Sequence, residues 1–297
     1  VEQLLGAGVE AAAALVGQAG VASVGAWDLK FARPDTAAAE RDHAARAGVQ
    51  AYDSAASLCA ASDLVISAVT ASNTLAVAEA AAPHMAPGAL LLDLNSASPG
   101  TKQQCAALIG GAGAHYVEAG VMTSVPPYGI RVPMLLGGAR AARLAPVLAG
   151  WGMDVRAVSD EIGVASAIKM CRSVMIKGLE ALVIESYSTA RAYGVEAHVL
   201  PTLAETFPGI DWEKQGAYFF SRVVQHGQRR AEEMRESART VGEAGFEPFM
   251  ARAIADKQQW VADQARRGVF AGLPGGAAWQ DYADRLLAAR HEGGETG

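Results

Sequence analysis

The chain is 297 residues long, 51% of its residues are hydrophobic, and its formal net charge is −6 at pH 7. This length predicts two domains, and the apolar content excludes an intrinsically disordered chain. The acidic balance argues against a nucleic-acid-binding protein, which normally carries a basic face. Cys59, Cys105 and Cys171 form no CxxC pair, so we expect reduced thiols in a cytoplasmic protein without a metal site. The apolar runs are too short for a membrane span, and no secretory signal pattern is expected.

Short apolar segments alternate with alanine-rich helical segments through the first half of the chain. The expected strands are Val1–Leu5, Val21–Trp27, Leu64–Val69, Ala89–Leu94, Ala114–Val117 and Met134–Leu136. The expected helices between them are Glu10–Gln18, Thr36–Ala47 and Thr74–Ala82. This order predicts an α/β domain over residues 1–160, with a doubly wound, mainly parallel sheet.

A G-x-G-x-x-A pattern, formed by Gly6, Gly8 and Ala11, follows the first expected strand and opens the first expected helix. Gly6 permits the tight turn, and Gly8 lets backbone N–H groups approach a pyrophosphate. Ala11 lets the helix pack close to the sheet, and the helix N-terminus attracts the anion. The pattern predicts a Rossmann-type dinucleotide-binding domain.

Asp28 lies 20 residues after Gly8, at the end of the second expected strand. A carboxylate at this position accepts hydrogen bonds from the adenosine ribose hydroxyls and favours NAD. Lys30 and Arg33 can instead hold the 2′-phosphate of NADP, and Asp28 can simply cap a turn. The expected cofactor is therefore NAD or NADP, with NAD favoured.

The alternation of strand-like and helix-like segments ends near residue 160. Residues 161–297 are predicted to form an all-helical domain without further strands. It begins with a long apolar helix, Val164–Tyr193, which leads from one domain into the other. Lys169, Ser173 and Lys177 recur along this helix at a spacing of four residues, so they share one face.

Lysines in so apolar a helix need ionic partners or a wet cleft. A lysine facing a cleft can act as a general acid or base, which makes Lys169 the candidate catalytic residue. The alternative is that this helix carries structural ion pairs, such as one between Lys177 and Glu180.

These segments resemble the β-hydroxyacid dehydrogenase family, which includes 3-hydroxyisobutyrate and 6-phosphogluconate dehydrogenases. Besides the glycine turn, the resemblance rests on four segments: Ser67–Thr70, Asp93–Pro99, Glu118–Ser124 and Gly163–Ser173. It implies a catalytic role for Lys169. It also implies cofactor contacts from the first two segments, which carry Val69, Thr70, Asn95 and Ser96.

The third segment resembles the family's substrate loop, but Met122, Thr123 and Ser124 stand where the family usually has Ser-Gly-Gly. Ser173 likewise stands where the family has an asparagine, beside Arg172. The resemblance implies substrate contacts at these five positions, and the departures imply an unfamiliar substrate. The C-terminal half resembles a less-studied, phosphogluconate-dehydrogenase-like branch.

The leading hypothesis is an NAD(P)-dependent oxidoreductase acting on a small hydroxy acid or its keto form, with Lys169 moving the hydroxyl proton. The alternatives are an imine reductase on the same scaffold and a non-catalytic NAD(P)-binding module. His226, Arg229 and Arg230 are further candidates near the cofactor, or members of an ordinary solvated helix. The family resemblance implies a homodimer or higher homo-oligomer; no nucleic-acid or membrane partner is expected.

Overall fold

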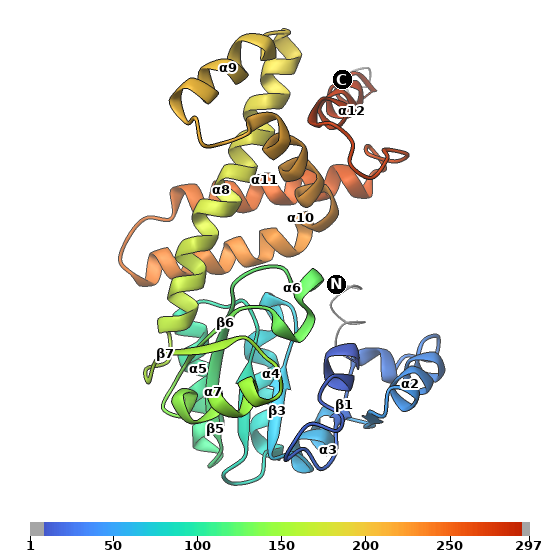
Figure 1. Cartoon of the computed structure of the whole chain (residues 1–297), viewed down its shortest axis with the longest axis vertical. Coiled ribbons are helices and arrows are strands. Elements are labelled where there is room, and N and C mark those ends of the chain that lie inside the picture. The colour runs from blue at the N-terminus through green and yellow to red at the C-terminus, as the bar shows by residue number, and fades with distance from the viewer. Residues whose placement is uncertain (1–8, 293–297) are drawn as a thin grey trace. The chain divides into compact units, whose positions relative to one another are not determined.

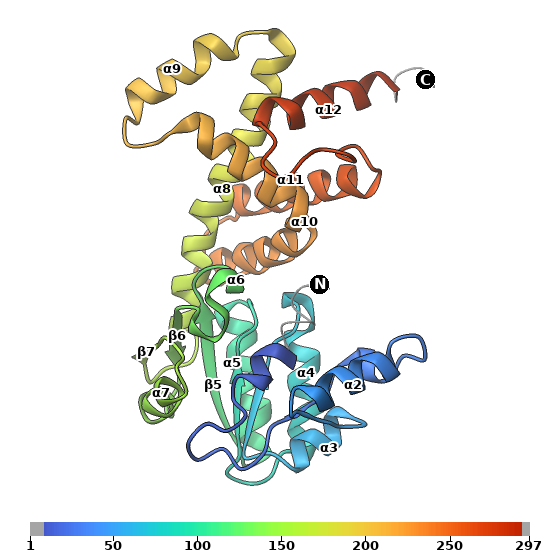
Figure 2. The same ribbon diagram turned by 45° about the vertical axis from the view of Figure 1, so that its right-hand side comes forward.

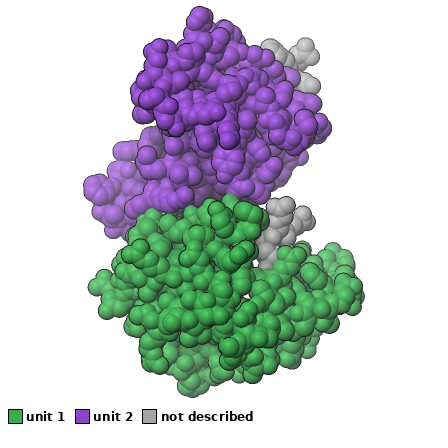
Figure 3. All heavy atoms as spheres, in the orientation of Figure 1, with its two compact units in different colours: residues 1–170 green, residues 171–297 purple. Residues whose placement is uncertain are grey.

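The computed structural model describes residues 9–292 and divides into two compact units, residues 1–170 and residues 171–297 (Figure 3). The division assigns the first two turns of the long helix to the first unit. The Val1–Leu5 strand and the glycines at 6 and 8 lie outside the described residues.

The first unit is built on a five-stranded sheet (Figure 1). Its strands, in spatial as well as chain order, are β3 (Leu64–Ser67), β4 (Leu90–Asp93), β5 (His115–Val121), β6 (Met134–Gly137) and β7 (Val155–Ser159). Only the β5–β6 pairing within this sheet is antiparallel. The predicted mainly parallel α/β sheet is confirmed, although β7 was not expected.

Helices cover both faces of this sheet, because successive side chains of a strand point to opposite sides. Leu91 packs with residues of α4 (Thr74–Ala81) and α5 (Pro99–Gly111), whereas Leu92 packs with α7 (Ala141–Gly150). The remaining helical pieces are α3 (Ala55–Ala60), α6 (Val125–Tyr128) and the 3₁₀ turns Leu29–Phe31, Ala71–Asn73, Ala82–His84 and Gly129–Arg131. The doubly wound arrangement follows from these two apolar layers.

The N-terminal part of the first unit departs from the prediction. The strand expected over Val21–Trp27 is reduced to β1 (Gly25–Ala26), which pairs in parallel with β2 (Gln50–Ala51) in a separate two-stranded sheet. The helix α2 (Ala37–Arg46) lies between them, as expected. Ala11 is exposed on the helix at residues 9–13, and the packing role expected of it belongs to Ala12 and Ala13, on the inward face.

The described residues of the second unit form helices and connecting loops without any strand, as predicted. The long helix α8 (Val164–Tyr193) has the predicted bounds and is followed by α9 (Glu196–Thr206), α10 (Trp212–Glu243), α11 (Phe249–Arg266) and α12 (Trp279–Glu292). Figure 2 shows α10 and α11 side by side, as does Figure 1. Aromatic residues of α8, α10 and α12 form the centre of this unit's core, including Tyr187, Phe220 and Trp279. Within residues 9–292, no helix has the length and apolar character needed to cross a membrane.

Candidate functional site

The loops that follow β3 and β4 are joined by the side chain of Asn95. Ser67 and Asp93 are register partners at the ends of these parallel strands, so the two loops start side by side. The Asn95 side chain is buried; its Oδ1 accepts a hydrogen bond from Val69 N at 2.6 Å, and its Nδ2 donates to Ser67 Oγ at 3.0 Å. The structure thus brings together two of the residues predicted to contact the cofactor. This edge of a parallel sheet is where α/β proteins bind their ligands.

The β4 loop begins in a buried ionic cluster. Asp93 Oδ1 lies 3.0 Å from Lys102 Nζ and also accepts a hydrogen bond from Asn95 N at 2.8 Å. Asp93 Oδ2 accepts a hydrogen bond from the Tyr116 hydroxyl at 2.5 Å. Burial, together with the Asp93 carboxylate, raises the pKa of Tyr116, which therefore remains a donor. All the charge in this cluster is paired, so its role is to fix the loop and not to react.

Lys169 and Ser96, 73 residues apart in sequence, meet in the first unit. Lys169 Nζ donates a hydrogen bond to Ser96 Oγ at 2.5 Å, and both residues are partly buried. The predicted catalytic lysine therefore reaches the loop predicted to contact the cofactor. An amine placed beside a cofactor loop can accept or deliver a proton there.

The predicted substrate loop leaves the end of β5. Its first residue is held by a hydrogen bond from Met122 N to Pro133 O at 2.9 Å. Thr123 is exposed, and Ser124 precedes α6. Gly120, at the end of β5, lies against α8: a Cβ there would be 3.0 Å from Ala165 O and 3.5 Å from Lys169 Cβ. The strand that leads into this loop therefore also supports the turn of α8 that carries Lys169.

Ser173 lies one helical turn beyond Lys169 on α8 and is buried, whereas Arg172 is exposed. Ser173 Oγ accepts a hydrogen bond from Lys177 Nζ at 3.3 Å, and Lys177 is paired with Glu233 at 2.6 Å. The alternative Lys177–Glu180 pair is wrong, because Glu180 is paired with Arg230 instead.

The charged residues predicted near the cofactor on α10 are also paired inside the second unit. Arg229 binds Glu233 at 2.7 Å, and Arg230 binds Glu180 through both carboxylate oxygens. Burial, followed by the charges of Arg222 and Arg229, lowers the pKa of His226 to about 4, so its ring is neutral at pH 7. The ion pairs agree with structural roles for Arg229 and Arg230.

Asp28, predicted to favour NAD, and Lys30, predicted to favour NADP, lie together at the 3₁₀ turn after β1. Asp28 Oδ1 accepts a hydrogen bond from Lys30 N at 2.9 Å, so Asp28 caps this turn. Lys30 Nζ lies 3.3 Å from Glu40 Oε1, and both side chains are partly buried. Glu40 thus offsets the charge of Lys30, while Arg33 is exposed.

Sequence reasoning missed Lys102, Tyr116 and the role of Glu118. Lys102 shares the buried face of α5 with Cys105 and Ile109, and a lysine at this spacing from apolar residues was the available signal for a buried cation. Glu118 stands in a buried strand without an ionic partner nearby in sequence. Neither pattern predicts which residue Lys102 or Glu118 contacts, because these contacts join elements that are far apart in the sequence.

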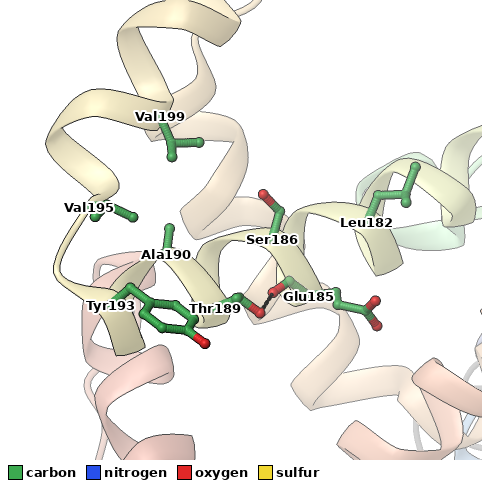
Figure 4. A pocket seen from close by; sticks show the side chains of 8 residues that line it. All are labelled: Leu182, Glu185, Ser186, Thr189, Ala190, Tyr193, Val195 and Val199. Carbon is green, nitrogen blue, oxygen red and sulfur yellow. Dashed lines mark hydrogen bonds between the residues drawn. The ribbon is translucent and has the colours of Figure 1, made fainter.

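The second unit also carries an open hollow along α8 and α9, shown in Figure 4. It is lined by Leu182, Glu185, Ser186, Thr189, Ala190, Tyr193, Val195 and Val199. Its acid, Glu185, is paired with Lys257 at 2.6 Å. In the described part of the chain, no cluster of His, Cys, Asp and Glu side chains has the arrangement of a metal site.

Two family models match the chain. The NAD binding domain of 6-phosphogluconate dehydrogenase matches residues 12–159, and a domain of unknown function, DUF1932, matches residues 190–261. The first match covers the sheet and the loops predicted to contact the cofactor, so the first unit is an NAD-binding domain.

Solved structures resemble the chain over nearly its full length. A conserved hypothetical protein from Sinorhizobium meliloti 1021 is 38% identical, with 95% of this chain and 90% of that chain covered and a TM-score of 0.71. The conserved protein MTH1747, of unknown function but similar in structure to 3-hydroxyacid dehydrogenases, is 28% identical over 89% of this chain and 94% of that chain, with a TM-score of 0.64. A Mycobacterium tuberculosis 3-hydroxyisobutyrate dehydrogenase has the same fold, at 20% identity over 88% and 92% of the two chains and a TM-score of 0.68.

Proposed function

Because the chain belongs to the β-hydroxyacid dehydrogenase family and is an NAD(P)-dependent oxidoreductase, we propose that it interconverts a small hydroxy acid and its keto form, with Lys169 as the general acid and base. The observation that carries this proposal is the contact between Lys169 Nζ and Ser96 Oγ at 2.5 Å. This contact supports a role for Lys169 in proton transfer, because Ser96 lies in the loop to which we assign cofactor binding.

The cofactor is NAD or NADP. We propose that it binds at the carboxyl edge of the sheet, where parallel α/β sheets bind their ligands. We assign its binding to Val69, Thr70, Asn95 and Ser96, with the adenosine end toward Asp28. NAD is favoured because Glu40 neutralises Lys30, which would otherwise attract a 2′-phosphate. When bound, the nicotinamide supplies or accepts the hydride.

Lys169 carries out the proton transfer in this proposal. A neutral amine has two N–H bonds and one lone pair, and donation of one N–H to Ser96 Oγ restricts the direction of the lone pair. During oxidation the lone pair takes the proton of the substrate hydroxyl as the carbonyl forms. In the reverse direction the ammonium returns that proton to the carbonyl oxygen.

We assign substrate contacts to Met122, Thr123, Ser124, Arg172 and Ser173. The first three are in the loop that follows Gly120, where β5 meets the Lys169 turn of α8. Ser173 follows Lys169 by one helical turn, which places both on one helix face. Substrate polar groups held there would keep the reacting carbon near Lys169.

A substrate panel combined with a lysine variant tests this proposal. Purified protein is supplied with NAD⁺ or NADP⁺ and a series of 2- and 3-hydroxy acids, and formation of the reduced cofactor is followed by absorbance. Lys169→Ala should lower kcat on the best substrate by roughly 10²- to 10⁴-fold, because the general acid and base is lost. The Kd of the cofactor, measured by fluorescence titration, should change little.

Lys214→Ala is the matched control, since Lys214 is an exposed lysine of α10. It should behave as the wild type. Unchanged turnover in the Lys169 variant would overturn the assigned role. Tight cofactor binding without turnover of any panel member would contradict the proposed reaction.

A further inference from the structure

Glu118 is a fully buried carboxylate in the middle of the sheet that the proposed chemistry does not use. It lies on β5, and its side chain is 0% exposed. Its Oε1 accepts hydrogen bonds from Gly163 N at 2.8 Å and from Ala165 N at 3.0 Å. Its Oε2 is buried without a hydrogen-bond partner among the described residues. A buried carboxylate with one bare oxygen is costly, so its position calls for a function.

The two amides that Glu118 binds are at the start of α8. The first backbone N–H groups of a helix have no partner within the helix, and an acceptor there fixes where the helix begins. The negative charge is also favourable at this positive end of the helix. Lys169 follows Ala165 by one turn, so any shift of this helix start moves Lys169 as well.

Small residues around Glu118 let α8 approach the sheet. A Cβ at Gly137 of β6 would lie 2.6 Å from Glu118 Oε1 and 3.1 Å from Glu161 O, so a larger residue there would displace the carboxylate. A Cβ at Gly120, two residues after Glu118, would lie 3.0 Å from Ala165 O and 3.5 Å from Lys169 Cβ, so β5 also packs closely against this turn. Hydrogen bonds and close packing therefore fix the same turn of α8.

The partner of Lys169 is held by the neighbouring strand. Asp93 of β4 is the register partner of Glu118, and its contacts with Lys102 and Tyr116 fix the loop that carries Ser96. Two adjacent buried carboxylates thus anchor the two sides of the Lys169–Ser96 contact.

We propose that Glu118 is a positioning residue for the reaction: it binds the first turn of α8 to β5 and thereby keeps Lys169 Nζ opposite Ser96. This inference rests on the proposed role of Lys169. It assigns to Glu118 an effect on kcat without any contact with substrate or cofactor.

The test compares Glu118→Gln with Glu118→Met in the full-length protein. Glutamine keeps an acceptor oxygen for the two amides, whereas methionine has a similar length and no comparable acceptor. Glu118→Met should lower kcat by roughly 10- to 100-fold, because small displacements of a reacting group are that costly, and the Kd of NAD⁺ should stay within about twofold. Glu118→Gln should retain most of the activity. Glu161→Ala, which removes an exposed acid near the start of α8, is the control and should match the wild type.

A second readout needs neither substrate nor cofactor. Amide hydrogen exchange in a peptide covering residues 163–170 should be faster in Glu118→Met than in the wild type and in Glu118→Gln. Where Glu118→Met is too unstable for kinetics, hydrogen exchange of its folded fraction is still compared with that of Glu118→Gln. Faster exchange at residues 163–170 in the Met variant alone supports hydrogen bonding as the anchor, and equal exchange in the two variants overturns it.

Three results would overturn the inference. One is a Met variant with kcat within twofold of the wild type, and another is a Met variant with unchanged exchange at residues 163–170. The third is an equal loss of kcat in the Gln and Met variants, since glutamine keeps an acceptor oxygen for the two amides and should retain most of the activity. The Lys169→Ala variant separates this failure from failure of the proposed function, since full activity there overturns the role of Lys169 itself.

Discussion

At the scale of single residues, the ionic partner of Lys30 bears on which cofactor the protein prefers. Lys30 is close to Asp28 in sequence, yet its charge is offset by Glu40, ten residues away on α2. An isolated Lys30 would favour NADP, and the ion pair is the reason we assign NAD.

This pair gives a prediction about cofactor choice. Glu40→Gln should release Lys30 and improve the kcat/KM for NADP⁺ relative to that for NAD⁺ by about 3- to 10-fold, in keeping with the modest worth of a partly exposed ion pair. Asp42→Asn, which changes an exposed acid on the same helix, should leave the ratio unchanged. Steady-state kinetics with NAD⁺ and with NADP⁺ measure the ratio of the two kcat/KM values. An unchanged ratio in the Glu40 variant would mean that Lys30 does not face the 2′ position.

The roles of residues were predictable to different degrees. The apolar helix and the resemblance of Gly163–Ser173 to the family's lysine segment selected Lys169 as a candidate, and the resemblance of Asp93–Pro99 to a cofactor loop selected Asn95 and Ser96. Their contacts were not predictable, because the Lys169–Ser96 bond joins positions 73 residues apart. Such a contact depends on how the strands and α8 pack, which local patterns do not specify.

At the scale of elements, long uninterrupted patterns were predicted best. The helix α8 has the predicted bounds because no proline interrupts the segment between Gly163 and Gly194, both of which adopt positive φ. The β1 and β2 strands have only two residues each, too few for a recognisable alternation. The β7 strand, Val155–Ser159, was missed because Arg156 interrupts its apolar residues.

The pairing of α10 with α11 gives a prediction about stability. A Cβ at Gly227 would lie 2.8 Å from the backbone oxygen of Gln258 on α11, so Gly227→Ala should force the helices apart and cost about 1–3 kcal/mol. Gly242, near the end of α10, has nothing within 4 Å of such an atom. Gly242→Ala should therefore be neutral or stabilising by up to about 1 kcal/mol, from helix propensity alone.

Urea unfolding of the two alanine variants, followed by circular dichroism, makes this comparison. Equal stabilities of the Gly227 and Gly242 variants would contradict close packing of α10 on α11.

At the scale of the whole molecule, we propose that the chain is a homodimer or a higher homo-oligomer. Large apolar side chains are exposed on α8 of the second unit, among them Met175 at 67%, Leu182 at 56% and Tyr193 at 78%. Exposed apolar surface of this kind commonly marks a protein interface.

Sedimentation at micromolar concentration tests the assembly. The wild type should sediment as a dimer or larger, and Leu182→Glu combined with Tyr193→Glu should shift it toward monomer. Leu29→Glu, at an exposed leucine of the first unit, is the control and should have no effect. A monomeric wild type would contradict the proposal.

The central claim is that Lys169 is the acid and base beside a nicotinamide bound at the carboxyl edge of the sheet. The measurement that tests it most directly is a crystal structure with NAD⁺ and the best substrate of the panel. We predict that Lys169 Nζ lies within hydrogen-bonding distance of the reacting oxygen, roughly 3 Å, with the nicotinamide beside Ser96. A reacting oxygen bound to another side chain, with Lys169 out of reach, would contradict the claim.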